Sequence, residues 1–139
     1  MKPGDAIPPL RYVPDKDVTR RYAAASGDRN PIHVDPAAAR AAGLPAPILH
    51  GLYTMAQVAR CAYRAAGDRE LRKLAVDFRA LGFPGEEIEV SGSVADVSDE
   101  HLRLHLVVRQ GRRRLIRNAR ATLAATGTTA QENWDASAT

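Results

Sequence analysis

Two side chains that can transfer protons, Asp28 and His33, lie five residues apart in a segment rich in turn-forming residues. Gly27 and Pro31 prevent this segment from forming a regular helix, and Pro31 also biases Asn30 toward extended geometry. The turn is therefore stiff, so both side chains can be held over one point with little loss of conformational entropy. A carboxylate and an imidazole held in this way are suited to general acid–base catalysis.

Taken singly, these residues are also typical of ordinary turns, in which His33 packs or caps a helix. The whole string is more specific: it runs from Tyr22 to Asp35 and is followed by a short Ala-rich helix and by Ile48-Leu49-His50-Gly51. It resembles the signature of the MaoC-like (R)-specific enoyl-CoA hydratases and 3-hydroxyacyl-thioester dehydratases, in which Tyr-Ala-x-x-Ser-Gly-Asp-x-Asn-Pro-Ile-His-x-Asp precedes Ile-x-His-Gly. The resemblance is densest over residues 20–56 and continues more weakly to about residue 124.

The resemblance implies that Asp28 and His33 are the catalytic pair and that the backbone N–H of Gly51 stabilises the thioester oxyanion. Adding water to a 2-enoyl thioester requires a held water, a group that accepts its proton and a proton donor for the α carbon. A glycine that opens a helix suits the oxyanion, because its N–H has no intrahelical acceptor and no side chain blocks the substrate carbonyl. The division of proton transfer within the coupled pair stays open.

Other candidate residues surround this pair. The substrate-binding candidates are Ser26, Asn30, His50, Tyr53 and Met55. We expect Ser26 and Asn30 to hold the loop or orient His33, and His50 to cap the helix that follows it. Tyr53 and Met55 would border the pocket and limit its depth.

Neither a metal nor a separate cofactor is expected. The histidines lack a spacing that would gather them on a metal ion. These histidines are His33, His50, His101 and His105. Coenzyme A or phosphopantetheine would arrive as part of the substrate.

The chain has 139 residues, the size of one domain, and a formal net charge of +4. This length is small for an enclosed acyl-chain pocket, so we expect a partner subunit; the resemblance favours a homodimer and leaves a heterodimer possible. Cys61, the one cysteine, cannot form an internal disulfide and lies in an apolar helical stretch, which indicates a packing residue. No signal peptide or apolar span of about 20 residues is visible, which predicts a cytoplasmic protein without membrane partners.

Much of the positive charge lies in one basic run near the C-terminus. Its members are Arg109, Arg112, Arg113, Arg114, Arg117 and Arg120. Aromatic residues are scarce and no nucleic-acid motif is present, so we expect no nucleic-acid partner. The phosphates of coenzyme A or an acidic carrier protein fit better, and a solvated strand face is the alternative. Since side chains alternate on a strand, Arg113 and Arg117 should face away from Arg112, Arg114 and Arg120.

The hydrophobic pattern predicts an α+β fold. Helices are expected over residues 16–25 with Asp15 as N-cap, from Asp35-Pro36 to Gly43, and over 51–66, where small residues permit close packing. Beyond residue 71 the period becomes two, which is typical of strands joined by turns in an antiparallel sheet.

The same alternation predicts where the strands lie and which side chains face the core. After a short extended piece at 10–13, strands are expected around 71–80, 88–94, 102–108 and 115–123. Phe78 is expected among the apolar residues of its strand, and Arg117 on the same side as Leu115 and Ala119. The resemblance implies a single hot-dog domain over 1–126, with an antiparallel sheet wrapped around a central helix. The polar composition of residues 127–139 predicts a flexible tail.

The resemblance favours reversible hydration of trans-2-enoyl thioesters to (R)-3-hydroxyacyl thioesters, and two alternatives stay open. Many hot-dog families are acyl-CoA thioesterases with a carboxylate on the central helix; residues 51–66 contain no Asp or Glu, although Asp28 could still serve hydrolysis. The other alternative is a non-catalytic acyl-CoA-binding module or dehydratase partner subunit. Such a protein would have no need of Asp28, His33 and Gly51 together.

Overall fold

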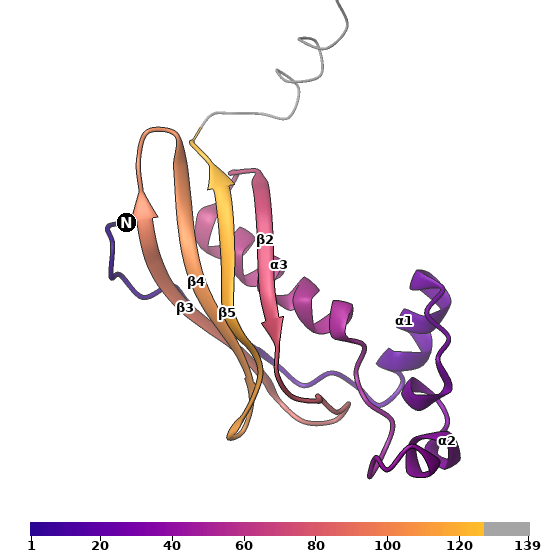
Figure 1. The fold of residues 1–139 in the computed structure, drawn as a ribbon. Helices are drawn as coiled ribbons and strands as arrows, with labels where there is room; N and C mark the ends of the chain where they lie inside the picture. Colours follow the sequence, from indigo (N-terminus) through magenta and orange to yellow (C-terminus); the bar gives the residue numbers. More distant parts are fainter. Residues whose placement is uncertain (127–139) are drawn as a thin grey trace, which may run out of the picture.

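The computed structural model describes residues 1–126, so the predicted tail over 127–139 lies outside the described part. Five strands form one antiparallel sheet in the order β1-β3-β4-β5-β2. The strands are β1 (Leu10–Tyr12), β2 (Leu71–Phe78), β3 (Ile88–Val97), β4 (His101–Gln110) and β5 (Arg113–Ala124). Helix α3 (Gly51–Ala66) packs along one face of this sheet (Figure 1). The structure confirms the predicted α+β hot-dog fold and both ends of its central helix.

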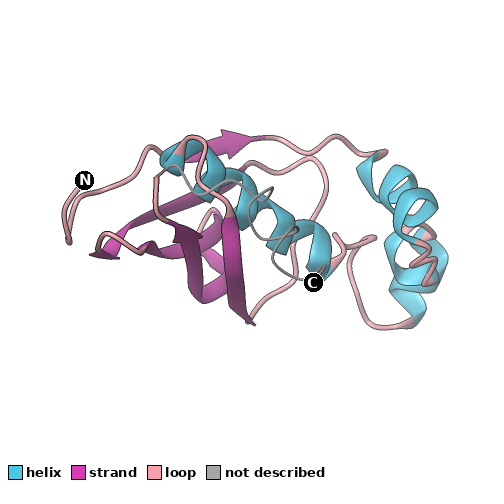
Figure 2. Ribbon diagram, turned by 90° about the horizontal axis from the view of Figure 1, so that it is seen from above, coloured by secondary structure: helices cyan, strands magenta, loops and turns pink. Residues whose placement is uncertain are grey.

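Three short helical elements lie together beyond one end of the sheet, close to where α3 begins (Figure 1, Figure 2). They are α1 (Val18–Ser26), the 3-10 helix η1 (Pro31–His33) and α2 (Pro36–Ala41). The Asp35 carboxylate caps α2 by accepting the Ala37 N–H at 2.9 Å, as predicted from Asp35-Pro36. From Asp28 the chain passes through η1 and α2 to the N-terminus of α3. None of the helices within residues 1–126 is long and apolar enough to cross a membrane.

Helix α1 begins later than predicted, and its expected N-cap was wrong. Asp17 occupies the N-cap position and makes no side-chain capping hydrogen bond. The Asp15 carboxylate instead accepts hydrogen bonds from the Asp17 N–H and the Arg21 guanidinium. Arg21 lowers the pKa of the Asp15 carboxyl through this hydrogen bond. Asp15 therefore stabilises the segment before the helix through its ion pair with Arg21 and does not cap the helix.

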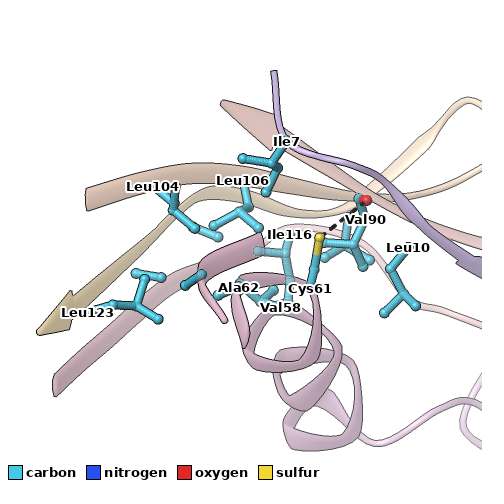
Figure 3. Packing of buried hydrophobic residues seen from close by; sticks show 14 of the residues in the cluster. Ile7, Leu10, Val58, Cys61, Ala62, Val90, Leu104, Leu106, Ile116 and Leu123 are labelled. Carbon is cyan, nitrogen blue, oxygen red and sulfur yellow. Dashed lines mark hydrogen bonds between the residues drawn. The ribbon is translucent and has the colours of Figure 1, made fainter. Parts of the chain in front are cut away.

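The core is built where α3 lies against the sheet, and small residues on the helix allow this close approach. Val58, Cys61 and Ala62 are fully buried against strand residues such as Val90 (Figure 3). The Cys61 thiol lies 3.7 Å from the carbonyl oxygens of Pro8 and Val90, and burial raises its pKa. The predicted packing role of Cys61 is confirmed.

A β-bulge in β5 places Arg117 on the opposite face of the sheet from the one predicted. Leu106 pairs with Ala119 and Val108 pairs with Ile116, so two residues, Arg117 and Asn118, lie opposite Val107. Asn118 has φ of 51°, and both it and Arg117 are exposed. The prediction that Arg117 shares a face with Leu115 and Ala119 was therefore wrong, because the extra residue turns Arg117 to the outer face.

The pairing of β2 with β5 is also irregular. The register shifts between Ala75 and Asp77, and Phe78 ends the strand with 49 % of its surface exposed. The prediction that Phe78 belongs to the apolar set of the strand interior was wrong. The register shift and its position at the strand end leave it partly in solvent, beside the N-terminus of α3.

Candidate active site

The loop between α1 and η1 is held by three consecutive hydrogen bonds from side chains to the backbone. Ser26 Oγ accepts the Asp28 N–H at 3.2 Å, Asp28 Oδ1 accepts the Asn30 N–H at 3.2 Å, and Asn30 Oδ1 accepts the Ile32 N–H at 3.3 Å. Short polar side chains of this kind satisfy backbone groups that a helix would otherwise use. Ser26 and Asn30 thus shape the loop, and one Asp28 oxygen, Oδ2, is directed toward His33.

His33 is buried in η1 with a single tautomer. Its Nδ1 lies 2.8 Å from the carbonyl oxygen of Ile48, which can only accept, so Nδ1 carries a proton, and in the neutral ring Nε2 presents a lone pair. Nε2 lies 3.9 Å from Asp28 Oδ2, beyond direct hydrogen-bond distance. Both atoms are acceptors, and a water between them can donate one proton to each. The Asp28 side chain is 55 % exposed, so this position is open to solvent and to a substrate.

His50 connects the loop to α3. Its ring stacks on His33 with centroids 3.8 Å apart and an interplanar angle of 18°. Its Nε2 lies 3.0 Å from the Asp28 carbonyl oxygen and therefore donates to it. Its Nδ1 is buried without a hydrogen-bond partner in the described part of the chain. His50 holds the N-cap position of α3, but its side chain makes no capping hydrogen bond and instead supports the ring of His33.

The N-terminus of α3 supplies the third feature of the site. The helix begins at Gly51, which is exposed, and N–H groups in the first turn have no intrahelical acceptors and carry the positive end of the helix dipole. A Cβ on Gly51 would lie 3.4 Å from Cε1 of Phe78, so this aromatic ring borders the helix start. Sequence reasoning missed Phe78 as a site residue, since no local pattern reveals where β2 ends relative to α3.

Tyr53 and Met55, the two residues expected to limit the pocket, lie in the first turns of α3. The Tyr53 hydroxyl lies 2.7 Å from the hydroxyl of Tyr12 in β1, and its ring meets Tyr22 of α1 edge-on. Burial, and then the hydrogen bond from Tyr53, raise the pKa of Tyr12. Met55 is half-buried and packs against the core. Tyr12 was not singled out from the sequence, because only the pairing of β1 with β3 brings it near α3.

Asp28, His33 and His50 bring their ligand atoms within 4.8 Å of one another. The spacing of His33 and His50 does not gather them; the loop brings the two rings together through their hydrogen bonds to backbone carbonyls. A zinc ion lies in the plane of each imidazole about 2.0–2.1 Å from its nitrogen. Stacked rings 3.8 Å apart cannot both aim an in-plane lone pair at such an ion. The geometry fits proton transfer better than metal binding.

A cavity of about 410 Å³ reaches His33. Lys16, Arg20, Val34 and Phe83 are among its lining residues, so two cations lie close to the imidazole. Asp28 and Gly51 lie outside this lining, at the exposed surface. A substrate carbonyl could thus approach the α3 N-terminus from solvent.

The sequence matches one protein family and segments of several known enzymes. The family model described as MaoC like domain matches residues 6–112. A 68-residue segment is 41 % identical to the enoyl-CoA hydratase ChsH3 of Mycobacterium tuberculosis and covers 47 % of this chain and 24 % of that protein. A 49-residue segment is 53 % identical to 3-hydroxyacyl-thioester dehydratase X of the same organism and covers 35 % of this chain and 17 % of that protein.

The fold has similar solved relatives. The (R)-hydratase from A. caviae involved in PHA biosynthesis has a TM-score of 0.82 at 20 % identity, over 90 % of this chain and 97 % of that one. The similarity to the curated relatives is more local, since the matched segment spans no more than 24 % of the length of each of them.

Proposed function

Because the chain belongs to the MaoC-like domain family, we propose that it catalyses the reversible hydration of trans-2-enoyl thioesters to (R)-3-hydroxyacyl thioesters. The thioester carrier would be coenzyme A or an acyl-carrier protein. One observation carries the proposal: the Nε2 lone pair of His33 and the Asp28 carboxylate face each other across 3.9 Å, a gap suited to a single water. This pair lies next to the open N-terminus of α3.

The water is the group that this geometry would activate. By donating to His33 Nε2 and Asp28 Oδ2, it would present an oxygen lone pair to the C3 atom of the enoyl thioester. The new C–O bond forms at C3, the pair takes one proton from the water, and one proton is returned to C2. The reverse sequence removes water, so hydration and dehydration use the same residues.

The negative charge that develops on the thioester oxygen has to be stabilised by a hydrogen-bond donor. The Gly51 N–H is the candidate, because the first turn of α3 offers unpaired N–H groups and a favourable dipole. Gly51 has no side chain to stand between this N–H and the substrate. The nearby ring of Phe78 would cover one side of the bound acyl group.

Turnover of crotonyl-CoA tests the proposal directly. We expect loss of the enoyl thioester, formation of (R)-3-hydroxybutyryl-CoA and no release of free thiol. Longer enoyl-CoAs and matching carrier-protein thioesters, assayed in parallel, identify the preferred substrate. Thiol release without hydration would instead show a thioesterase, and absence of turnover with every thioester would contradict an enzymatic role.

Asp28→Asn and His33→Ala should each lower kcat by at least about a hundredfold, the scale of positioned acid–base groups. The double variant should be little worse than the poorer single variant, because the two groups act as a unit. Asp99→Asn, an exposed substitution on the β3–β4 hairpin, is the matched control and should keep wild-type kcat. Circular dichroism checks that each variant is folded, and near-wild-type turnover of a folded Asp28→Asn protein would exclude the assignment.

A further inference from the structure

A second hollow, of about 340 Å³, lies on the outer face of the sheet, opposite α3. Four of its lining residues are arginines: Arg109 of β4, and Arg114, Arg117 and Arg120 of β5. His105 also lines it, and none of its lining residues is Asp or Glu. The hollow is thus a strongly basic site, separated from the α3 N-terminus by the sheet itself.

Two irregularities in the pairing of β5 with β4 create this concentration of charge. In a regular strand, Arg117 would face away from Arg114 and Arg120. Arg117 and Asn118 together oppose Val107, and a second register shift leaves Leu115 between the pairs Val108–Ile116 and Arg109–Arg114, so that all three arginines reach the same hollow. Arg113 does not join them: its guanidinium pairs with Glu86 and lies over the ring of Phe83.

Two acids that pair with these arginines across the sheet already have hydrogen-bond partners. Glu89, which pairs with Arg109 in the β3–β4 register, accepts a hydrogen bond from Arg11 at 2.7 Å. Asp77, opposite Arg117, accepts the Asn118 amide at 3.1 Å. Within residues 1–126 the four arginines make no ion pair.

One guanidinium donor is moreover buried and unpartnered. The Nε atom of Arg109 is shielded from solvent and has no hydrogen-bond partner in the described part of the protein. A buried donor without an acceptor is unfavourable, and four cations around one hollow repel each other. An anion bound in the hollow would offset the repulsion among the four cations.

We propose that this hollow binds the phosphate groups of a nucleotide-like ligand with more than one phosphate. Guanidinium groups recognise phosphate with paired N–H donors, and four of them match several phosphates better than one monovalent anion. The volume suits a small ligand rather than a macromolecule. The phosphates could belong to the nucleotide end of coenzyme A, in which case the inference rests on the proposed function, or to a free nucleotide.

Isothermal titration calorimetry with inorganic pyrophosphate and 3′,5′-adenosine bisphosphate tests the site. Arg114→Gln/Arg117→Gln should weaken both affinities at least tenfold. Arg40→Gln/Arg64→Gln removes the same charge from exposed positions on α2 and α3 and should change them less than twofold. Equal weakening by both double variants, no binding to the wild-type protein, or equal affinity for sulfate would overturn the proposal.

Kinetics then separates the two sources of phosphate. If the site holds the nucleotide of coenzyme A, Arg114→Gln/Arg117→Gln should raise KM for crotonyl-CoA about tenfold with kcat unchanged. The same variant should leave KM for crotonyl-pantetheine, which lacks the nucleotide, unaltered. If the ligand is a free nucleotide, the double variant keeps both KM values but still loses affinity for pyrophosphate and 3′,5′-adenosine bisphosphate. Either kinetic result supports the site. Calorimetry requires no turnover, so failure of the hydratase assay would leave this test intact.

Discussion

At the scale of single residues, backbone carbonyl groups determine which nitrogens of the site can act as bases. The Ile48 carbonyl keeps the His33 proton on Nδ1, and the Asp28 carbonyl keeps the His50 proton on Nε2. Only His33 then presents a free Nε2 toward the Asp28 carboxylate. The second histidine is consequently a positioning residue, and its ring limits the orientation of the first.

His50→Gln tests this positioning role. Glutamine can still donate a hydrogen bond to the Asp28 carbonyl, but it cannot stack on the imidazole of His33. We expect kcat to fall about tenfold with KM little changed, because the His33 ring gains freedom and misalignment of a catalytic group slows the chemical step. The measurements are kcat, KM and the midpoint of urea unfolding.

The two controls separate positioning from stability. His50→Ala removes the hydrogen bond as well and should cost a further 1–3 kcal/mol, roughly, because the Asp28 carbonyl loses its donor. His101→Gln makes the same change on the distant β4 strand and should leave kcat alone. A wild-type kcat for folded His50→Gln would show that His50 serves stability only.

The sequence is informative about residues that are close together in the chain and less so about those that meet in space. Asp28, His33 and Gly51 could be singled out as candidates because two short motifs, residues 22–35 and 48–51, carry them. The stacking of His50 on His33 and the approach of Phe78 to Gly51 could not, because each depends on how a loop or a strand end is placed against α3.

At the scale of elements, irregular pairing accounts for the wrong predictions of strand faces. Period-two reasoning located the four strands β2 to β5, since turns and apolar alternation are local signals, whereas β1 was expected only as a short extended piece. It failed at Arg117, because a bulge adds one residue that no short-range pattern announces. This bulge and the second register shift in β5 together assemble the basic hollow on the outer face.

Gly92 lies where β3 and β4 leave no room for a side chain. A Cβ at this position would lie 2.2 Å from the His105 carbonyl oxygen and 3.0 Å from Leu106 Cγ. The carbonyl belongs to the backbone of a central strand, so it cannot yield as a side chain would. Gly92→Ala should therefore destabilise the protein by at least about 2 kcal/mol, since overpacking of this kind forces backbone shifts.

Urea unfolding measures this effect as a lower midpoint for Gly92→Ala. Ser93→Ala, at the adjacent half-buried position, is the control and should lie within about 0.5 kcal/mol of wild type, as is usual away from special features. An unchanged midpoint for Gly92→Ala would mean that the strands can separate locally without cost.

At the scale of the whole molecule, one face combines an open strand edge with exposed apolar side chains. β2 ends the strand order, so one side of this eight-residue strand has no neighbour in the sheet. Leu52 and Tyr63 of α3 and Phe78 of β2 are 64 %, 46 % and 49 % exposed. Unpaired edges and apolar patches of this kind favour association. Gly51 and Asp28 are exposed beside this face, which leaves an acyl chain without an enclosing wall in one copy.

We therefore expect a symmetric homodimer in which a second copy covers the open β2 edge and completes the acyl pocket. Tyr63→Glu places a charge on this face at the far end of α3, twelve residues or about 18 Å from Gly51 at 1.5 Å per residue. It should shift the protein toward monomer and make specific activity rise with protein concentration, because only the dimer encloses the substrate. Val13→Glu puts the same charge on an exposed apolar residue outside α3 and β2 and should preserve the dimer. Light scattering and concentration-dependent assays measure both effects, and a wild-type monomer with full activity would refute the dimer.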